Sequence, residues 1–199
     1  MEKILARVIQ IVFHPLLIST AAVFILFKTN LYFAYIPEHI REIITFSTLL
    51  TTGIIPLIFI IFIGSIQQRT KANFPGITII YLFTAVSYYL EYYLISKMPL
   101  AGFFKAGFLA GTLVLVSLSL ISLRWNISSH LAGVGAMAGV TVALMLRLGV
   151  FNPFFLAAVL LAGGLTGFSR LALEKNNPAQ VLAGFVLGFG ILFSVFSYI

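Results

Sequence analysis

The chain has 199 residues, of which 61% are hydrophobic and only 9% charged, and no soluble fold has enough interior to hide that much apolar surface. We therefore expect an all-α polytopic membrane protein forming a single domain over residues 1–199, located in a bacterial inner membrane. The formal net charge of +7 predicts contact with lipid headgroups or a lipid phosphate. The basic residues are scattered over short loops, which disfavours nucleic acid as a partner, and the lack of cysteine excludes disulfides and thiolate metal sites.

Seven stretches approach the length of about 20 apolar residues that a membrane span requires. They are roughly Ile4–Phe27, Ile43–Ile66, Phe74–Ile95, Gly102–Leu123, Ser128–Val150, Pro153–Phe168 and Pro178–Tyr198. Pro153 and Pro178 suit the first turn of a helix, and Ser128 is an expected N-cap. No small-residue cleavage pattern follows the first stretch, which is therefore expected to be a retained helix rather than a signal peptide. Paired broken helices of the kind found in transporters are not expected.

With seven spans, the loops after the second, fourth and sixth stretches lie on the same side of the membrane as the N-terminus. These loops carry the polar residues that are candidates for binding an anion: Arg69, Lys71, Arg124, Ser128, Ser129, His130, Ser169, Arg170 and Lys175. The N-terminal side then carries more basic residues than the other side, which favours a cytoplasmic N-terminus. The balance reverses when the candidate site residues are removed, so the orientation stays open.

The polar segment Ser169–Gln180 separates the last two stretches. An Arg at the end of one membrane helix, followed by a tight Asn-Pro turn into the next helix, is typical of an anion site at a membrane surface. The spacing resembles the third signature of the type 2 phosphatidic acid phosphatase superfamily, Ser-Arg-x5-His-x3-Asp. Ser169 and Arg170 match this signature, whereas Asn176 stands at the His position and Gln180 at the Asp position.

The segment Ile127-Ser128-Ser129-His130 resembles the second signature of the same superfamily, Pro-Ser-Gly-His. In that family the His is the general acid, a role that falls on His130. Hydroxyl groups and free N–H groups at a helix N-terminus favour an anion there. The alternative interpretation is a Ser N-cap followed by an interfacial His. Small residues four apart follow both signatures, as at Gly184 and Gly188, and predict close helix packing.

The first signature, Lys-x6-Arg-Pro, has no clean match. The loop with Arg69, Lys71 and Pro75 resembles a compressed variant of it, and an ordinary basic loop is the alternative.

The resemblance implies a membrane helical bundle with a phosphatidic acid phosphatase-like core, without a metal or a cofactor. It also implies phosphate binding by Arg170, Ser169, Ser128, Ser129, Arg69 and Lys71. In the family the third-signature His attacks phosphorus to form a phosphohistidine, and the Asp orients that His. The amide of Asn176 cannot act as this nucleophile, and Gln180 supplies no orienting charge. We therefore expect a phosphate or lipid-headgroup pocket with weak or no catalysis, a pseudoenzyme. The alternatives are a non-catalytic accessory subunit of a membrane complex and an active lipid or polyprenyl-phosphate phosphatase with an atypical site.

Two further ionisable residues fall within apolar stretches. His14, directly before Pro15, is expected to stabilise a kink or to face a ligand, since a His at that depth needs a polar partner. Glu91, surrounded by Tyr88, Tyr89, Tyr92 and Tyr93, is interpreted as the one acid of an interfacial aromatic belt, without a chemical role. His39 is expected on the far face of the membrane.

Overall fold

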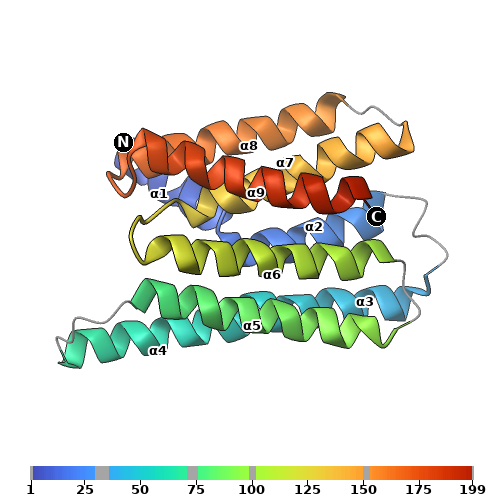
Figure 1. Ribbon diagram of the computed structural model, residues 1–199, viewed down its shortest axis with the longest axis horizontal. Helices are drawn as coiled ribbons and strands as arrows, with labels where there is room; N and C mark the ends of the chain where they lie inside the picture. Colours follow the sequence, from blue (N-terminus) through green and yellow to red (C-terminus); the bar gives the residue numbers. More distant parts are fainter. Residues whose placement is uncertain (1, 30–35, 71–75, 99–101, 150–152, 199) are drawn as a thin grey trace.

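The computed structural model describes residues 2–29, 36–70, 76–98, 102–149 and 153–198, and within these ranges every regular element is a helix (Figure 1). In chain order the elements are α1 (Glu2–Val12), α2 (Pro15–Thr29), α3 (Glu38–Thr48), the π-helical segment η2 (Leu49–Ile54), α4 (Ile55–Thr70), α5 (Gly76–Ser96), α6 (Gly102–Ser122), α7 (Ser129–Leu148), α8 (Pro153–Ala172) and α9 (Pro178–Tyr198). The predicted all-α fold is confirmed. The helices lie side by side along the long axis of the molecule.

Five helices in the described ranges are long and apolar enough to cross a membrane. They are the continuous rod of α3, η2 and α4 over Glu38–Gln67, and α6, α7, α8 and α9. A sixth span results when α1 and α2, which meet at an angle of 55°, are taken together. Helix α5 has 21 residues, like α6 beside it, but is not among these five because its sequence holds several tyrosines and Glu91. The chain is an integral membrane protein on this evidence, and the seven-span arrangement stays a prediction.

The first predicted span, Ile4–Phe27, is not continuous. The helix breaks at His14, because Pro15 lacks an N–H and disfavours helical backbone at the preceding residue. Pro15 then occupies the first position of α2, where the missing N–H costs nothing. The sixth span is longer than predicted and continues beyond Phe168 to Ala172.

A π-helical segment, η2, interrupts the second span. Pro56 has no N–H to give to a carbonyl four residues earlier, and the N–H of Ile55 bonds to the carbonyl of Leu50, five residues earlier. Gly53, buried in the middle of η2, packs near the carbonyl of Leu16 on α2. Wide turns of this kind occur frequently at functional sites, since they redirect side chains and free backbone groups.

Helices α7 and α9 pack with their backbones in contact. A Cβ atom added to Gly188 would overlap the carbonyl oxygen of Ala132, and one added to Gly135 would overlap that of Phe185. The close approach expected from the small residues is therefore present. It fixes the start of α7, which carries His130, against the start of α9.

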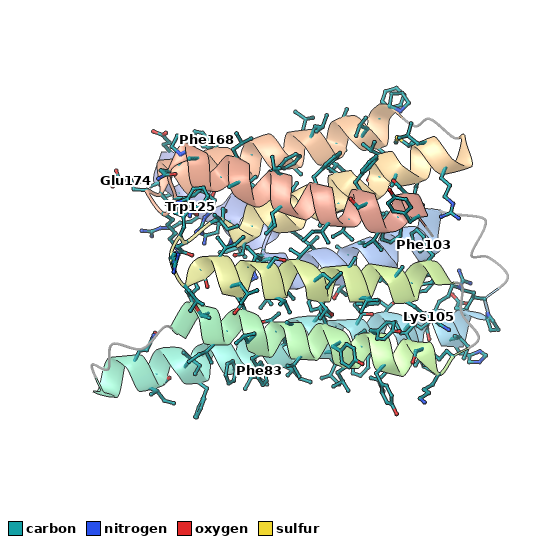
Figure 2. The ribbon with its side chains drawn as sticks, viewed as in Figure 1. Phe83, Phe103, Lys105, Trp125, Phe168 and Glu174 are labelled. Atoms are coloured by element: carbon teal, nitrogen blue, oxygen red, sulfur yellow. The ribbon has the colours of Figure 1, made fainter. Side chains whose placement is uncertain are left out.

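The loops that carry the candidate anion ligands are flanked by helix ends that lie together. We call this end, where α1, α5, α7 and α9 begin and α4, α6 and α8 end, the N-terminal end of the bundle (Figure 1). Figure 2 shows Trp125, from the loop between α6 and α7, and Glu174, from the turn between α8 and α9, at this end, with Lys105 at the opposite end. Helix α3, whose second residue is His39, begins at that opposite end.

Candidate functional site

A cavity of about 810 Å³ runs inside the bundle between α2, α5, α6, α7 and α9. Most of its lining is apolar, including Ile18, Val140 and Phe196. Several polar side chains of the lining come from the break between α1 and α2, the starts of α5 and α7, the loop before α7 and the end of α8: His14, Tyr81, Asn126, Ser129, His130 and Arg170. A cavity of this size, largely apolar with a few convergent polar groups, is typical of a small-molecule site.

His130, in the first turn of α7, is the most unusual member of the polar group. Its side chain is only 6% exposed, and neither ring nitrogen has a hydrogen-bond partner among the described residues. Buried polar atoms are almost always paired, so two unpaired ring nitrogens on a residue that lines a cavity make His130 a candidate for a functional role.

The ring of His14 lies against His130 in an edge-to-face arrangement, with 5.3 Å between the ring centroids. His14 occupies the break between α1 and α2, where its Nδ1 accepts a hydrogen bond of 3.3 Å from the N–H of Leu16. The side chain of His14 also forms part of the cavity wall. His14 therefore lies in the kink before Pro15 and also lines the cavity.

Arg170 brings a positive charge to the same part of the cavity. It lies in the last turn of α8, where a cation also complements the helix dipole. Its Nε donates a hydrogen bond of 2.8 Å to Oδ1 of Asn176, and the guanidinium interacts electrostatically with His130 and with Tyr81. The side chains of Tyr81 and Ser129 also interact, so the polar group extends across α5, α7 and α8.

Asn176, at the position of the nucleophile in the resembled family, links three segments. Besides accepting the hydrogen bond from Arg170, it donates from Nδ2 to the carbonyl of Asn126 and to Oε1 of Gln180, both at 3.2 Å. Its side chain is 8% exposed, and it is not part of the cavity lining. In this structure Asn176 orients Arg170 and joins two loops.

Gln180 and Asn177 form a capping box at the start of α9. Oδ1 of Asn177 accepts from the N–H of Gln180 at 2.8 Å, and Oε1 of Gln180 accepts from the N–H of Asn177 at 2.9 Å. The carbonyl of Gln180 also accepts from the N–H of Ser128 at 3.1 Å. Gln180 therefore has a structural role at the position of the orienting Asp.

Of the remaining candidate ligands, some make hydrogen bonds within the bundle and others are exposed to solvent. The hydroxyl of Ser169 is fully buried and donates to the carbonyl of Ala6 on α1 at 2.7 Å, while Ser128 accepts from the N–H of Leu131 as the predicted N-cap. Arg124 and Lys175 are exposed. Arg69 lies in the last turn of α4 with its side chain outside the described part, and Lys71 lies outside the described residues. The cavity thus receives Ser129, His130 and Arg170 from the predicted set.

Three residues of the polar framework were missed from the sequence. Tyr81 and Asn126 line the cavity, and only the position of Asn126 in a polar loop hinted at this. Glu91, interpreted as the acid of an interfacial aromatic belt, faces the interior of the bundle, since its side chain is 0% exposed and bonded to α3 and η2. The sequence did contain partners for this carboxylate, namely the hydroxyl residues Ser47, Thr48 and Thr51 of α3 and η2.

The polar end of the cavity carries groups of the kind that bind anions. Arg170 supplies N–H donors with a full charge, His130 two ring nitrogens, and Ser129 a hydroxyl. The described residues contain no group of three or more His, Cys, Asp or Glu side chains that could hold a metal ion.

Comparison of the chain with protein-family models, with curated proteins and with solved structures finds no match. The resemblance to the phosphatidic acid phosphatase superfamily therefore rests on the two signature-like segments alone.

Proposed function

We propose that this protein binds an amphiphile with a phosphate headgroup inside the membrane and does not hydrolyse it. The observation that carries the proposal is His130, buried in the wall of a largely apolar cavity, with both ring nitrogens unpaired and the guanidinium of Arg170 in the same wall. A phosphate group would accept from the one N–H of the His130 ring and from the guanidinium of Arg170, and a phosphate hydroxyl would donate to the other ring nitrogen.

The charge of Arg170 determines where the headgroup would bind, and the apolar lining determines where the tail would lie. Arg170 binds phosphate oxygens through the planar fork of its guanidinium, which Lys cannot reproduce. The rest of the cavity, towards Val140 and Phe196, is apolar and suits a hydrocarbon tail. A tail there removes apolar area from contact with water, at about 25 cal/mol per Å².

Two arguments favour binding without turnover. No group at the position of Asn176 can attack phosphorus, and the hydrogen bonds of Asn176 hold it against Arg170, Asn126 and Gln180, away from the cavity wall. His130 alone could protonate a leaving group but has no nucleophile to cooperate with. The resemblance to the phosphatase superfamily belongs to the same proposal: it explains the Arg and His positions as an anion site from which the nucleophile has been replaced.

Trp125, the one tryptophan of the chain, allows the proposal to be tested. It is 43% exposed and precedes Asn126, which lines the cavity. In detergent, titration with dodecyl phosphate should change the fluorescence of Trp125 in a saturable way. Monododecyl glycerol, with the same tail and a neutral head, should bind more weakly.

Two variants locate the headgroup in this titration. Arg170→Ala and His130→Ala should each weaken binding of dodecyl phosphate by about tenfold or more, the effect of losing a hydrogen bond to a charged group. Lys175→Ala, in the same turn but exposed, should bind as the wild type does. Equal affinity in all four proteins would count against a headgroup site at Arg170 and His130.

A further inference from the structure

A second polar site lies away from the cavity's polar end, around Glu91 on α5. Its side chain is 0% exposed. Oε1 lies 2.8 Å from the hydroxyl of Ser47 and 3.0 Å from that of Thr48, and Oε2 lies 3.0 Å from the hydroxyl of Thr51. All three hydroxyls come from α3 and η2, so one carboxylate is surrounded by oxygen atoms of a single neighbouring rod.

Within the part of the chain that the structure describes, the carboxylate of Glu91 has no protein countercharge. No ion pair with Glu91 is found among the described residues. Arg41, the basic residue of α3, directs Nη1 towards the carbonyl of Phe27 instead. A buried carboxylate without a paired cation is strongly unfavourable in an apolar environment, and hydroxyl donors compensate only part of this.

The hydroxyl hydrogens also have competing acceptors. Ser47 has one hydrogen but lies 3.0 Å from the carbonyl of Ile44 as well as 2.8 Å from Glu91. Thr51 likewise lies 2.9 Å from the carbonyl of Ser47 and 3.0 Å from Glu91. When these hydrogens go to the carbonyls, the two hydroxyl oxygens present lone pairs towards the carboxylate. A cation coordinated by these oxygens would stabilise this arrangement, whereas without it the hydroxyls of Ser47, Thr48 and Thr51 donate to the carboxylate.

The backbone and a chain of hydroxyls favour the same conclusion. Thr51 belongs to η2, where the helix widens before Pro56. From Thr48, hydroxyl contacts continue through Thr52 and Ser19 to Tyr88: Thr52 bonds to the carbonyl of Thr48 at 2.8 Å, Ser19 to Thr52 at 2.8 Å, and Tyr88 to Ser19 at 3.0 Å. Ser19 and Tyr88 line the cavity, so a polar route leads from the cavity to Glu91.

We propose that Glu91, Ser47, Thr48 and Thr51 form a binding site for one Na⁺ ion. All ligands are oxygen atoms, which suits a hard cation. A single carboxylate neutralises a single charge, so a divalent ion would leave an uncompensated charge in the interior of the bundle. The ligands are close together on two adjoining helical turns, which favours a small ion over K⁺. The site shares no residue with the phosphate site, and its test does not depend on phosphate binding.

The test is equilibrium binding of ²²Na⁺ to the purified chain in detergent, at constant ionic strength set with choline chloride. The wild type should bind Na⁺ saturably, with displacement by Li⁺ and little displacement by K⁺. Glu91→Gln, which keeps the size of the side chain and an oxygen acceptor, should abolish saturable binding. Thr51→Val, which removes one ligand oxygen at nearly constant volume, should weaken it by about tenfold or more.

Glu42→Gln is the matched control, because Glu42 is an exposed acid on α3, and this variant should bind Na⁺ as the wild type does. Circular dichroism establishes that each variant keeps its helices. Absence of saturable binding by the wild type would overturn the proposal, as would equal binding by the wild type and Glu91→Gln. In either case Glu91 would be a hydrogen-bonded packing residue only.

Discussion

The Nε of Arg170 donates a hydrogen bond of 2.8 Å to Oδ1 of Asn176. The residue that stands at the nucleophile position of the resembled family therefore holds the side chain of Arg170. Through Nδ2 the same Asn176 also joins the loop between α6 and α7 at Asn126. In this arrangement Asn176 positions the side chain of Arg170, which lines the cavity.

The first prediction concerns this link. Asn176→Ala should lower the free energy of unfolding by about 1–3 kcal/mol, because it removes the hydrogen bonds of the buried Asn176 side chain to the half-buried Arg170 and to the carbonyl of Asn126. Thermal unfolding in detergent, followed by Trp125 fluorescence, measures the change. Lys175→Ala is the control, because the side chain of Lys175 is exposed, and this variant should unfold at the wild-type temperature. An Asn176→Ala protein as stable as the control would remove the structural role of Asn176.

The second prediction concerns catalysis. The wild type should release no inorganic phosphate from phosphatidic acid or undecaprenyl diphosphate. Asn176→His should give at most weak activity, because the imidazole lacks an orienting carboxylate, and Asn176→His with Gln180→Asp should be more active. The second change also alters the capping box, so the double variant should be less stable than the single one. Robust turnover by the wild type that is lost in His130→Ala would contradict the account.

A third prediction follows from the contact of α7 with α9. Gly188→Ala should strongly destabilise or unfold the chain, because its Cβ would overlap the carbonyl of Ala132 and force the helices apart. Gly190→Ala is the control in the same helix: no atom lies within 4 Å of its added Cβ, and it should be neutral or stabilising, by up to about 1 kcal/mol. Equal yields and melting temperatures for the two variants would show that the helices are not in backbone contact.

A fourth prediction concerns the end of α8. Glu174 has a φ of 55°, in the left-handed region, and the N–H of Lys175 bonds to the carbonyl of Arg170 at 3.1 Å, as in a Schellman motif. Glu174→Gly should therefore stabilise the chain by about 1 kcal/mol, since glycine adopts this conformation without strain. Lys175→Gly, one residue later, should not stabilise it. A lower melting temperature for Glu174→Gly would be evidence against this turn.

The features that depend on local sequence were predictable. Pro153 and Pro178 start helices, Ser128 caps α7, and the small residues at Gly184 and Gly188 bring α9 against α7. Each of these follows from the chemistry of one residue and its immediate neighbours.

Features that depend on the directions of side chains from different helices were not predictable. The sequence around Glu91 shows only its tyrosine neighbours along α5. Its hydrogen-bond partners are three hydroxyls on α3 and η2, which are distant in the sequence. The hydroxyl of Ser169 likewise finds its acceptor, the carbonyl of Ala6, at the other end of the chain. Signature spacing places residues in one loop but does not determine which of them face the cavity.

Phosphorus-31 NMR of the purified protein with dodecyl phosphate tests the central claim most directly, because a single spectrum distinguishes a bound phosphate monoester from released inorganic phosphate. We expect a shifted and broadened monoester signal with the wild type, its loss in His130→Ala, its persistence in Lys175→Ala, and no growth of an inorganic phosphate signal with time. A monoester signal unchanged by the wild-type protein would contradict the proposed phosphate site. A growing inorganic phosphate signal would contradict binding without hydrolysis.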